Sequence, residues 1–417
     1  MNDDLINSIS NNSTPSEAEI EDYSAIIANK PDRVFYPKSH QECLALIKWA
    51  NSKKIEINLR GAGTGTTGGA IATSNKQIII SLQNMNQILE VDHKNATITV
   101  EPGVVLSKIH DIVESKGLFY PPDPASLKQC TIGGNISENA GGPRALKYGV
   151  TRDYVIGLKG VWGNGRDFTY GGKLKKNVAG FDLIGLLVGS EGTLAVITEI
   201  TLKLRPKPNV VKEAIAGYSS SQFALEALTS ALSSGILPST AEFMTKQCVK
   251  AAEMYMSEAL QIKEHNAYVI WQVDGFTEPD VIEQLAKIKA IGKSESFVEM
   301  NTKKMSDHIW SIRRNVSLGL KKMAGKKFSE DIVVPISSVP EVIEKLERMT
   351  HSSGIQVLGY GHLGDGNIHV NILKMTASED DWEKYTPEII EKVMQLAVKY
   401  GGSISGEHGI GLTKKQF

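Results

Sequence analysis

Two glycine-punctuated segments near the end of the chain carry residues that could bind a cation and move a proton. GYGHLGDGNIHVNIL places His362 and His369 on either side of a Gly-Asp-Gly turn, so the two imidazoles can face each other across a hairpin. GGSISGEHGIG carries Glu407 and His408 on a loop. Two imidazoles and one carboxylate leave a fourth position open, which is the composition of a catalytic zinc or manganese site. The alternative, satisfied core histidines and a solvated loop acid, is disfavoured because all these residues are flanked by glycine.

A pair of arginines could bind an anionic ligand. HIWSIRRNVSLGL offers Arg313 and Arg314 beside Trp310. A guanidinium binds a carboxylate through two parallel hydrogen bonds. The alternative is an ordinary basic helix face.

Two glycine-rich blocks in the first half of the chain could bind phosphate. LRGAGTGTTGGA (59–70) follows an expected helix and a short strand, and its small residues let successive backbone N–H groups point into one concavity. Its spacing is not that of a Rossmann turn, and it lacks the P-loop lysine. A second block spans 121–165. Two such loops around a strand-rich region suggest a large dinucleotide held between two lobes, and the alternative for the first is a flexible loop.

The elements that must position these residues fall into two halves. The first half is rich in glycine and short strands and ends at RPKP (205–208), because proline cannot continue a strand ladder. The second half alternates helices and strands. Its last helix is expected to have Thr386 as its cap and Pro387 at its first position, and to end at Gly401 and Gly402.

Composition excludes several classes of protein. With 417 residues, 41% hydrophobic and 22% charged, the chain is expected to form two or three globular domains. A net charge of -1 gives no field that would attract nucleic acid or an anionic membrane. Its three distant cysteines support neither disulfides nor a cysteine-ligated metal. No signal peptide or membrane span is visible, so a cytoplasmic location is expected, with a peripheral position at the inner face of the membrane left open.

The motifs RGAGTG, PPDP, TIGGNISENAGG, KYG, VGSEGTLAVITE, GHLGDGNIH and GEHGIG stand in this order. The combination resembles the flavin-dependent 2-hydroxyacid dehydrogenases of the vanillyl-alcohol-oxidase-like, PCMH-type FAD family, which include the glycolate oxidase D-subunit, D-lactate dehydrogenase and D-2-hydroxyglutarate dehydrogenase. The resemblance implies an α+β fold with three parts. These are a polar, partly helical segment at 1–30, a PCMH-type FAD-binding domain of two α+β lobes at 31–207, and a substrate-binding cap with an antiparallel sheet and flanking helices at 208–417. Relatives continue with a further helical segment, so the C-terminal part of the FAD lobe is expected to be truncated.

The resemblance also implies the FAD contacts. The first loop would wrap the pyrophosphate, and the second block and Ile197 would line the flavin and the ribityl chain. The implied cofactor-binding residues are Arg60, Gly61, Ala62, Gly63, Thr64, Gly65, Thr67, Gly68, Gly69, Pro122, Asp123, Gly133, Gly134, Asn135, Ser137, Asn139, Gly141, Gly142 and Ile197. Relatives that bond FAD covalently use a histidine where Thr64 stands, so noncovalent FAD is expected.

By the same resemblance His362, His369 and Glu407 match metal ligands, Zn²⁺ or Mn²⁺, and His408 matches the base. A hydroxyl proton is too weakly acidic to leave unaided at neutral pH. A divalent cation and a neutral imidazole would together remove it while hydride passes to flavin N5. The expected reaction is oxidation of a 2-hydroxy acid of the D-lactate or glycolate type to the 2-oxo acid.

The substrate would be bound by Arg313, Ser317 and Asn371. The hydroxyglutarate enzymes carry a lysine just before the strand that contains the DIVVP motif, where this chain has Ser329 and Glu330. That departure favours monocarboxylates. The expected electron acceptor is an electron-transfer flavoprotein, an iron–sulfur subunit or a quinone, and a homodimer is left open. Two other functions stay open, a zinc-dependent hydrolase and a non-catalytic flavoprotein subunit of an electron-transfer complex.

Overall fold

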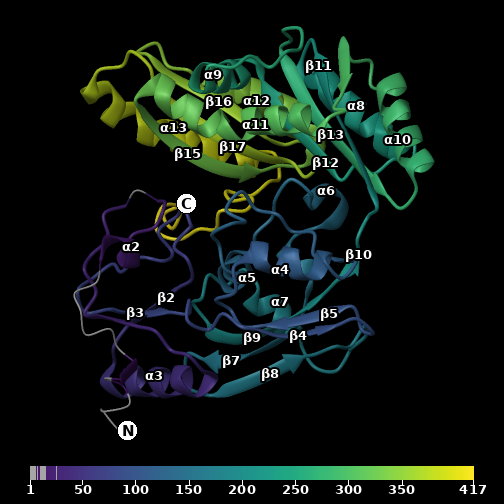
Figure 1. Ribbon diagram of the computed structural model, residues 1–417. Coiled ribbons are helices and arrows are strands. Elements are labelled where there is room, and N and C mark those ends of the chain that lie inside the picture. Colours follow the sequence, from purple (N-terminus) through teal and green to yellow (C-terminus); the bar gives the residue numbers. More distant parts are fainter. Residues whose placement is uncertain (1–5, 7, 10–15, 25) are drawn as a thin grey trace. The chain divides into compact units, whose positions relative to one another are not determined.

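The computed structural model describes residues 6, 8, 9, 16–24 and 26–417, so part of the expected segment 1–30 (residues 1–5, 7, 10–15 and 25) lies outside the described residues. The chain divides into two compact units (Figure 1). The first comprises Met1–Gly141, Gly149–Lys207 and Glu407–Gln416, and the second comprises Gly142–Tyr148, Pro208–Gly406 and Phe417.

The first unit contains the elements α2 (Glu17–Ile20), β1 (Arg33–Phe35), α3 (His40–Lys53), β2 (Ile57–Arg60), β3 (Ile78–Ser81), β4 (Ile88–Asp92), β5 (Thr97–Val100), α4 (Leu106–Glu114), β6 (Leu118–Phe119), α5 (Ile132–Glu138), the 3₁₀ turn η1 (Thr151–Asp153), β7 (Val155–Trp162), β8 (Asp167–Gly171), α7 (Leu183–Leu187), β9 (Ala195–Lys203) and β10 (Arg205–Pro206). The second unit contains α6 (Ala145–Tyr148), β11 (Val210–Tyr218), α8 (Ser221–Ser233), β12 (Thr240–Thr245), α9 (Lys246–Met256), β13 (Ala267–Gly275), α10 (Glu278–Ile291), β14 (Ser296–Glu299), α11 (Lys303–Ala324), β15 (Lys326–Val333), the 3₁₀ turn η2 (Ile336–Ser338), α12 (Val339–Arg348), β16 (Ile355–His362), β17 (Asn367–Lys374) and α13 (Glu379–Lys399).

The first unit is built on two main sheets. One is parallel, in the order β1-β3-β2, and α3 connects β1 to β2. Helix α3 buries Leu46, Ile47 and Ala50, and the Ser39 hydroxyl caps its first turn by accepting from Glu42 N. The other sheet is antiparallel, in the order β4-β5-β9-β7-β8, and packs against α4 and α5. The expected α+β architecture of this part of the chain is therefore confirmed.

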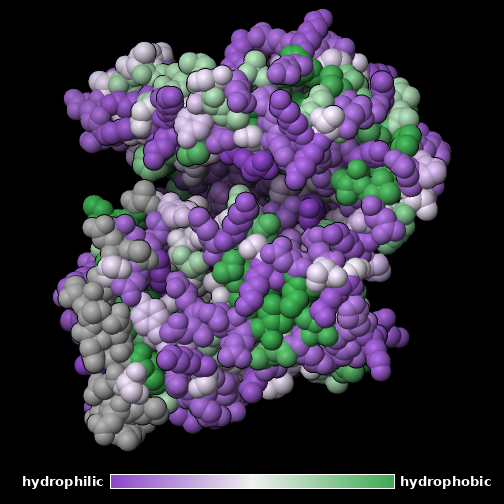
Figure 2. Space-filling view, viewed as in Figure 1, coloured by the Kyte–Doolittle hydropathy of each residue, from purple (hydrophilic) through white to green (hydrophobic). Residues whose placement is uncertain are grey.

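One part of the first unit exposes apolar side chains. The segment before and within α7 exposes Leu174, Val178, Phe181 and Leu186, of which Val178 and Phe181 are 97% and 92% exposed. Figure 2 shows hydrophobic colouring on the part of this unit where α7 lies.

The second unit is built on one seven-stranded sheet in the order β14-β11-β13-β12-β16-β17-β15, and every neighbouring pair is antiparallel. Helices α8, α10, α12 and α13 share one apolar core with the sheet, and α9 and α11 share another. Because side chains alternate along a strand, these two cores use opposite faces of the sheet. The expected cap, an antiparallel sheet with flanking helices, is confirmed.

The expected start of the last helix is wrong. Helix α13 begins at Glu379, the Ser378 hydroxyl accepts from Asp381 N, and Pro387 lies inside the helix. The two turns before Pro387 are stabilised because Trp382 is buried and stacks on Phe328. Proline removes one hydrogen bond from a helix, and both Pro387 and the residue four positions before it are exposed, so water can satisfy the freed carbonyl.

In the part of the chain that the structure describes, no helix combines the length and the apolar character needed to cross a bilayer.

Candidate functional site

The first glycine-rich loop is held from inside by Arg60. This side chain is only 3% exposed and donates to the carbonyl oxygens of Glu21 and Ala70, at 2.6 and 3.2 Å. Gly63 has a φ of +70°, and a Cβ there would lie 2.1 Å from Arg60 Nη2. Glycine is therefore required at 63, and the contacts described for Arg60 shape the loop.

The two glycine-rich blocks meet although residues 71–120 of the sequence lie between them. A Cβ on Gly61 would lie 2.6 Å from Thr131 Oγ1 and 3.7 Å from Gly134 N, whereas a Cβ on Gly65 would have no atom within 4 Å. Thr131 caps α5 by accepting from Gly134 N at 3.4 Å. The backbone of one block thus closely approaches that of the other, beside a stretch of the first loop that is open.

The other residues expected to bind FAD lie within these two blocks, apart from Ile197. Asn139 ends α5 in the left-handed conformation and accepts from Arg152 N at 2.9 Å, and Ser137 O accepts from Glu191 N at 2.8 Å. The carbonyl of Pro122 accepts from His110 Nε2 at 3.0 Å. Gly142 belongs to the second unit, and Ile197 is a buried member of the antiparallel-sheet core.

The segment that carries Glu407 and His408 belongs to the first unit, together with these loops. Glu191 accepts from Ile410 N at 2.8 Å and from Gly411 N at 2.7 Å, and Thr67 Oγ1 donates to His408 O at 3.2 Å. A Cβ on Gly141 would lie 3.2 Å from Glu407 Oε2. The two side chains that could do chemistry, Glu407 Oε1 and His408 Nε2, lie 3.9 Å apart.

Glu138 lies in the same place and was not identified from the sequence. A Cβ on Gly409 would lie 2.1 Å from its Oε2. Burial, followed by the charges of Glu191 and Asp22, raises the pKa of Glu138 to about 8. At neutral pH this group is therefore mostly a neutral acid. Glu191 itself stands in the turn Gly189-Ser190-Glu191-Gly192.

The two histidines of the hairpin converge in the second unit. The loop between β16 and β17 is four residues long (363–366), one more than the sequence suggested, because Leu363 is buried and donates its N–H to Ala241 O. His362 then pairs with Asn367, and His369 is displaced by two residues along β17. The two rings are 5.2 Å apart at their centroids and nearly perpendicular, at 83°.

A buried carboxylate that the sequence did not reveal joins this hairpin to the expected arginine. Glu242 on β12 is paired in register with His362, is 1% exposed, accepts a short hydrogen bond from His362 Nδ1 and forms an ion pair with Arg313. Burial by itself would raise the pKa of Glu242, but Arg313 and His362 outweigh it and hold the pKa below its ordinary value. The only sequence signal was an acid inside an otherwise apolar strand, TAEFMT.

A second buried carboxylate, Asp331 on β15, lies beside β17, the other strand of the hairpin. It is fully buried, faces His369 in register, and its Oδ1 lies 3.7 Å from His369 Nδ1. Its Oδ2 accepts from Gly406 N at 2.8 Å and from Ser405 Oγ at 3.3 Å. Asp331 therefore fixes the last residue before Glu407.

The two arginines of helix α11 lie in different surroundings. The Arg313 side chain is 11% exposed and lies over the Tyr360 ring at 4.8 Å, whereas Arg314 is exposed. Ser317, one turn later, and Asn371 on β17 both contact Lys327. The expected substrate residues Arg313, Ser317 and Asn371 thus lie on the same face of the sheet as the histidines, and Arg314 does not share their site.

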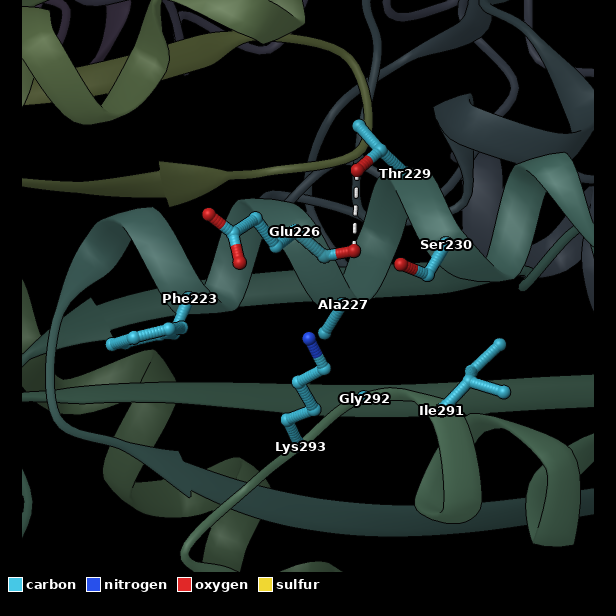
Figure 3. Close-up of a pocket in the computed structure, with 8 residues that line it drawn as sticks. All are labelled: Phe223, Glu226, Ala227, Thr229, Ser230, Ile291, Gly292 and Lys293. Atoms are coloured by element: carbon cyan, nitrogen blue, oxygen red, sulfur yellow. Dashed lines mark hydrogen bonds between the residues drawn. The ribbon is translucent and has the colours of Figure 1, made fainter.

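The small cavity drawn in Figure 3 is separate from these residues. It measures about 120 Å³, lies between α8 and the end of α10, and is lined by Phe223, Glu226 and Lys293 among others. None of the residues expected to bind cofactor, metal or substrate lines it.

The chain matches two family models. Residues 31–170 match an FAD binding domain, and residues 207–417 match the C-terminal domain of FAD linked oxidases. Three curated relatives are similar over most of their length. Glycolate oxidase subunit GlcD of Bacillus subtilis is 38% identical over 93% of this chain and 82% of the relative. D-lactate dehydrogenase of Archaeoglobus fulgidus is 36% identical over 91% of this chain and 83% of the relative. D-2-hydroxyglutarate dehydrogenase of Xanthomonas citri pv. viticola is 32% identical over 93% of this chain and 82% of the relative.

Solved structures share the fold at low identity. Alkyldihydroxyacetonephosphate synthase superimposes with a TM-score of 0.74 and 18% identity, over 97% of this chain and 80% of that one. p-Cresol methylhydroxylase with substrate bound gives a TM-score of 0.72 and 15% identity, over 99% of this chain and 85% of that one.

Proposed function

Since the chain belongs to the family of FAD-linked oxidases that act on hydroxy acids, we propose that it oxidises a 2-hydroxy acid of the D-lactate or glycolate type to the 2-oxo acid with the help of a divalent cation. The observation that carries this proposal is the row Arg313, Glu242, His362 and His369 on one face of the cap sheet, in which Glu242 and His362 are buried and the other two are partly buried. A zinc-dependent hydrolase would leave the FAD binding domain without a use, so that alternative is set aside.

The first unit fits noncovalent FAD. The approach of Gly61 to Thr131 and the open space at Gly65 form a backbone cradle that any larger side chain would fill. Thr64 cannot form the covalent bond that a histidine forms in some relatives. FAD supplies the hydride acceptor of the reaction. The residues of the cradle hold and orient it.

The donor set fits a cation such as Zn²⁺ or Mn²⁺. Glu242 accepts from His362 Nδ1, which fixes the tautomer so that Nε2 is the ring nitrogen available for coordination. We assign His362, His369 and Glu407 as the ligands. A divalent cation supplies Lewis acidity, which makes a hydroxyl proton easier to remove.

The remaining steps belong to side chains of this chain. Arg313, with Ser317 and Asn371, binds and orients the substrate carboxylate. His408 accepts the hydroxyl proton at Nε2, the ring nitrogen nearer to Glu407. An electron-transfer flavoprotein, an iron–sulfur subunit or a quinone would accept the two electrons that FAD takes up from the substrate.

Anaerobic bleaching of the flavin absorbance tests the proposal. D-lactate or glycolate should reduce the flavin of the wild type. Prior treatment with a chelator should slow the reduction strongly, and Zn²⁺ or Mn²⁺ should restore it. His408→Ala should abolish the reduction, whereas His93→Ala, which changes an exposed histidine, should not alter it. A rate that a chelator does not affect would remove the cation from the mechanism.

A further inference from the structure

A partly buried acid at the end of α5 lies between the segments that form the FAD cradle, and it is not among the residues that the sequence motifs assign to FAD. Glu138 is the last residue of α5. A Cβ on Gly69 would lie 3.6 Å from Glu138 Oε1, and a Cβ on Gly409 would lie 2.1 Å from Glu138 Oε2. The two carboxyl oxygens therefore face the first glycine-rich loop and the C-terminal segment that carries His408.

One of these oxygens has no partner in the protein. Glu138 Oε2 is buried and makes no hydrogen bond with any of the residues that the structure describes. The great majority of buried polar side-chain atoms in proteins have a hydrogen-bond partner, because a buried polar atom without one destabilises the fold. The orphaned oxygen therefore indicates that a group other than the protein chain completes this site.

The charges around Glu138 keep its carboxyl group protonated at neutral pH. Burial, followed by the charges of Glu191 and Asp22, raises the pKa of Glu138 to about 8. Both oxygens of Glu191 already accept backbone N–H groups of the C-terminal segment. In the first loop and beside Gly409 the ionisable groups are Arg60, Glu407 and His408. Glu138 therefore holds a proton, and a protonated carboxyl group is a hydrogen-bond donor.

The acceptor for this proton is more readily supplied by FAD than by a cation. FAD carries an anionic diphosphate, ribityl hydroxyls and the acceptor atoms of the flavin ring. A neutral carboxyl group can donate a hydrogen bond to such a ligand, whereas an ionised one would repel its negative charge. A cation would instead require Glu138 to lose its proton. The two kinds of ligand therefore shift the proton in opposite directions.

We propose that Glu138 is a cofactor-binding residue whose uncharged carboxyl group donates a hydrogen bond from Oε2 to FAD, so that above neutral pH this group takes up a proton from solvent when FAD binds. This inference rests on the part of the proposed function that places FAD in the cradle, and it does not depend on which substrate the protein oxidises.

The pH dependence of FAD release tests the proposal. The holoprotein is diluted at pH 6.5, 7.5, 8.5 and 9.5, and the fluorescence of the released FAD gives its Kd. For the wild type the Kd should be nearly constant below pH 7.5 and should rise by up to about tenfold per pH unit above pH 8, because an ionised Glu138 must regain a proton before it can donate. Glu138→Gln keeps an N–H donor and cannot ionise, so its Kd should not rise. His408 is present in both proteins, so the comparison isolates the proton of Glu138.

Two further variants make the result specific. Glu138→Leu removes the donor and should weaken FAD binding at pH 7 by about tenfold, the factor that corresponds to loss of one hydrogen bond. Glu56→Gln is the matched control, because Glu56 is exposed and lies outside the two glycine-rich blocks, and it should keep the pH dependence of the wild type. The same pH dependence in the wild type and in Glu138→Gln would overturn the proposal. A wild-type Kd that falls as the pH rises would overturn it in favour of a cation held by ionised Glu138.

The outcome for Glu138 can be separated from the outcome for the proposed function. A wild type that shows the expected rise in Kd, but whose flavin is bleached by no 2-hydroxy acid, would refute the proposed function alone. A wild type whose flavin is bleached, but whose Kd follows that of Glu138→Gln at every pH, would refute the role of Glu138 alone.

Discussion

The buried carboxylate of Glu242 offers the sharpest test of how the cap site is held together. Glu242 is 1% exposed, while the side chains of its partners Arg313 and His362 are 11% and 7% exposed. Glu242→Gln keeps the shape and one hydrogen-bond acceptor but removes the charge. The Arg313 guanidinium would then remain buried without a counter-ion.

The expected loss of stability is large. Removing one partner of a buried ion pair costs about 3–5 kcal/mol, and glutamine should cost about 3 kcal/mol because it keeps the packing. With an m-value of about 2 kcal/mol/M in urea, the unfolding midpoint should fall by about 1.5 M. Urea unfolding followed by tryptophan fluorescence measures this, since Trp271 is fully buried in the cap and Trp310 donates to Glu213 close to the site.

Two further variants make the test specific. Glu283→Gln removes an exposed carboxylate that pairs with Lys287 one turn away on α10, and it should leave the midpoint unchanged. The double variant Glu242→Leu with Arg313→Met leaves neither charge buried. Its loss of unfolding free energy should therefore be smaller than the sum of the losses caused by the two single substitutions. If Glu242→Gln shifted the midpoint no more than Glu283→Gln does, the description of Glu242 as the charged centre of this network would be wrong.

Two other predictions concern the first unit. Between the ordinary pKa of Glu138, near 4.5, and its raised pKa of about 8, the folded chain holds a proton that the unfolded chain has released, so stability due to this group falls as pH rises through that window. Glu138→Gln should therefore be more stable than the wild type by roughly 1.4 kcal/mol for each unit by which the pKa is raised. The whole of this gain should be present above pH 8, and none of it near pH 4.5. Urea midpoints at pH 5, 7 and 9 measure the gain, and a difference between the two proteins that does not depend on pH would contradict the prediction. Because Thr64 replaces the histidine of covalent relatives, hot acid or denaturant should release the flavin, and yellow colour that stays with the precipitated chain would count against a noncovalent site.

Local sequence was enough for the class of fold and for the candidate loops. The two-residue alternation of β17 places His369 and Asn371 on one face, and the glycines around His362 and His369 predicted a hairpin that brings the two imidazoles near each other. Both features depend on the two-residue period of a strand and on turn chemistry, which act over a few residues. The same local reasoning failed at Pro387, where packing of Trp382 outweighs the proline signal.

The partners of these residues were decided only by the tertiary structure. Glu242 meets His362 across 120 positions of sequence because β12 pairs with β16 in one particular register. Lys327 reaches Asn371 because β15 is the edge strand next to β17. A strand's own pattern tells which side chains share a face, but the partner strand and its register depend on the packing of the whole sheet, so the charge balance of the site could not be derived from the sequence.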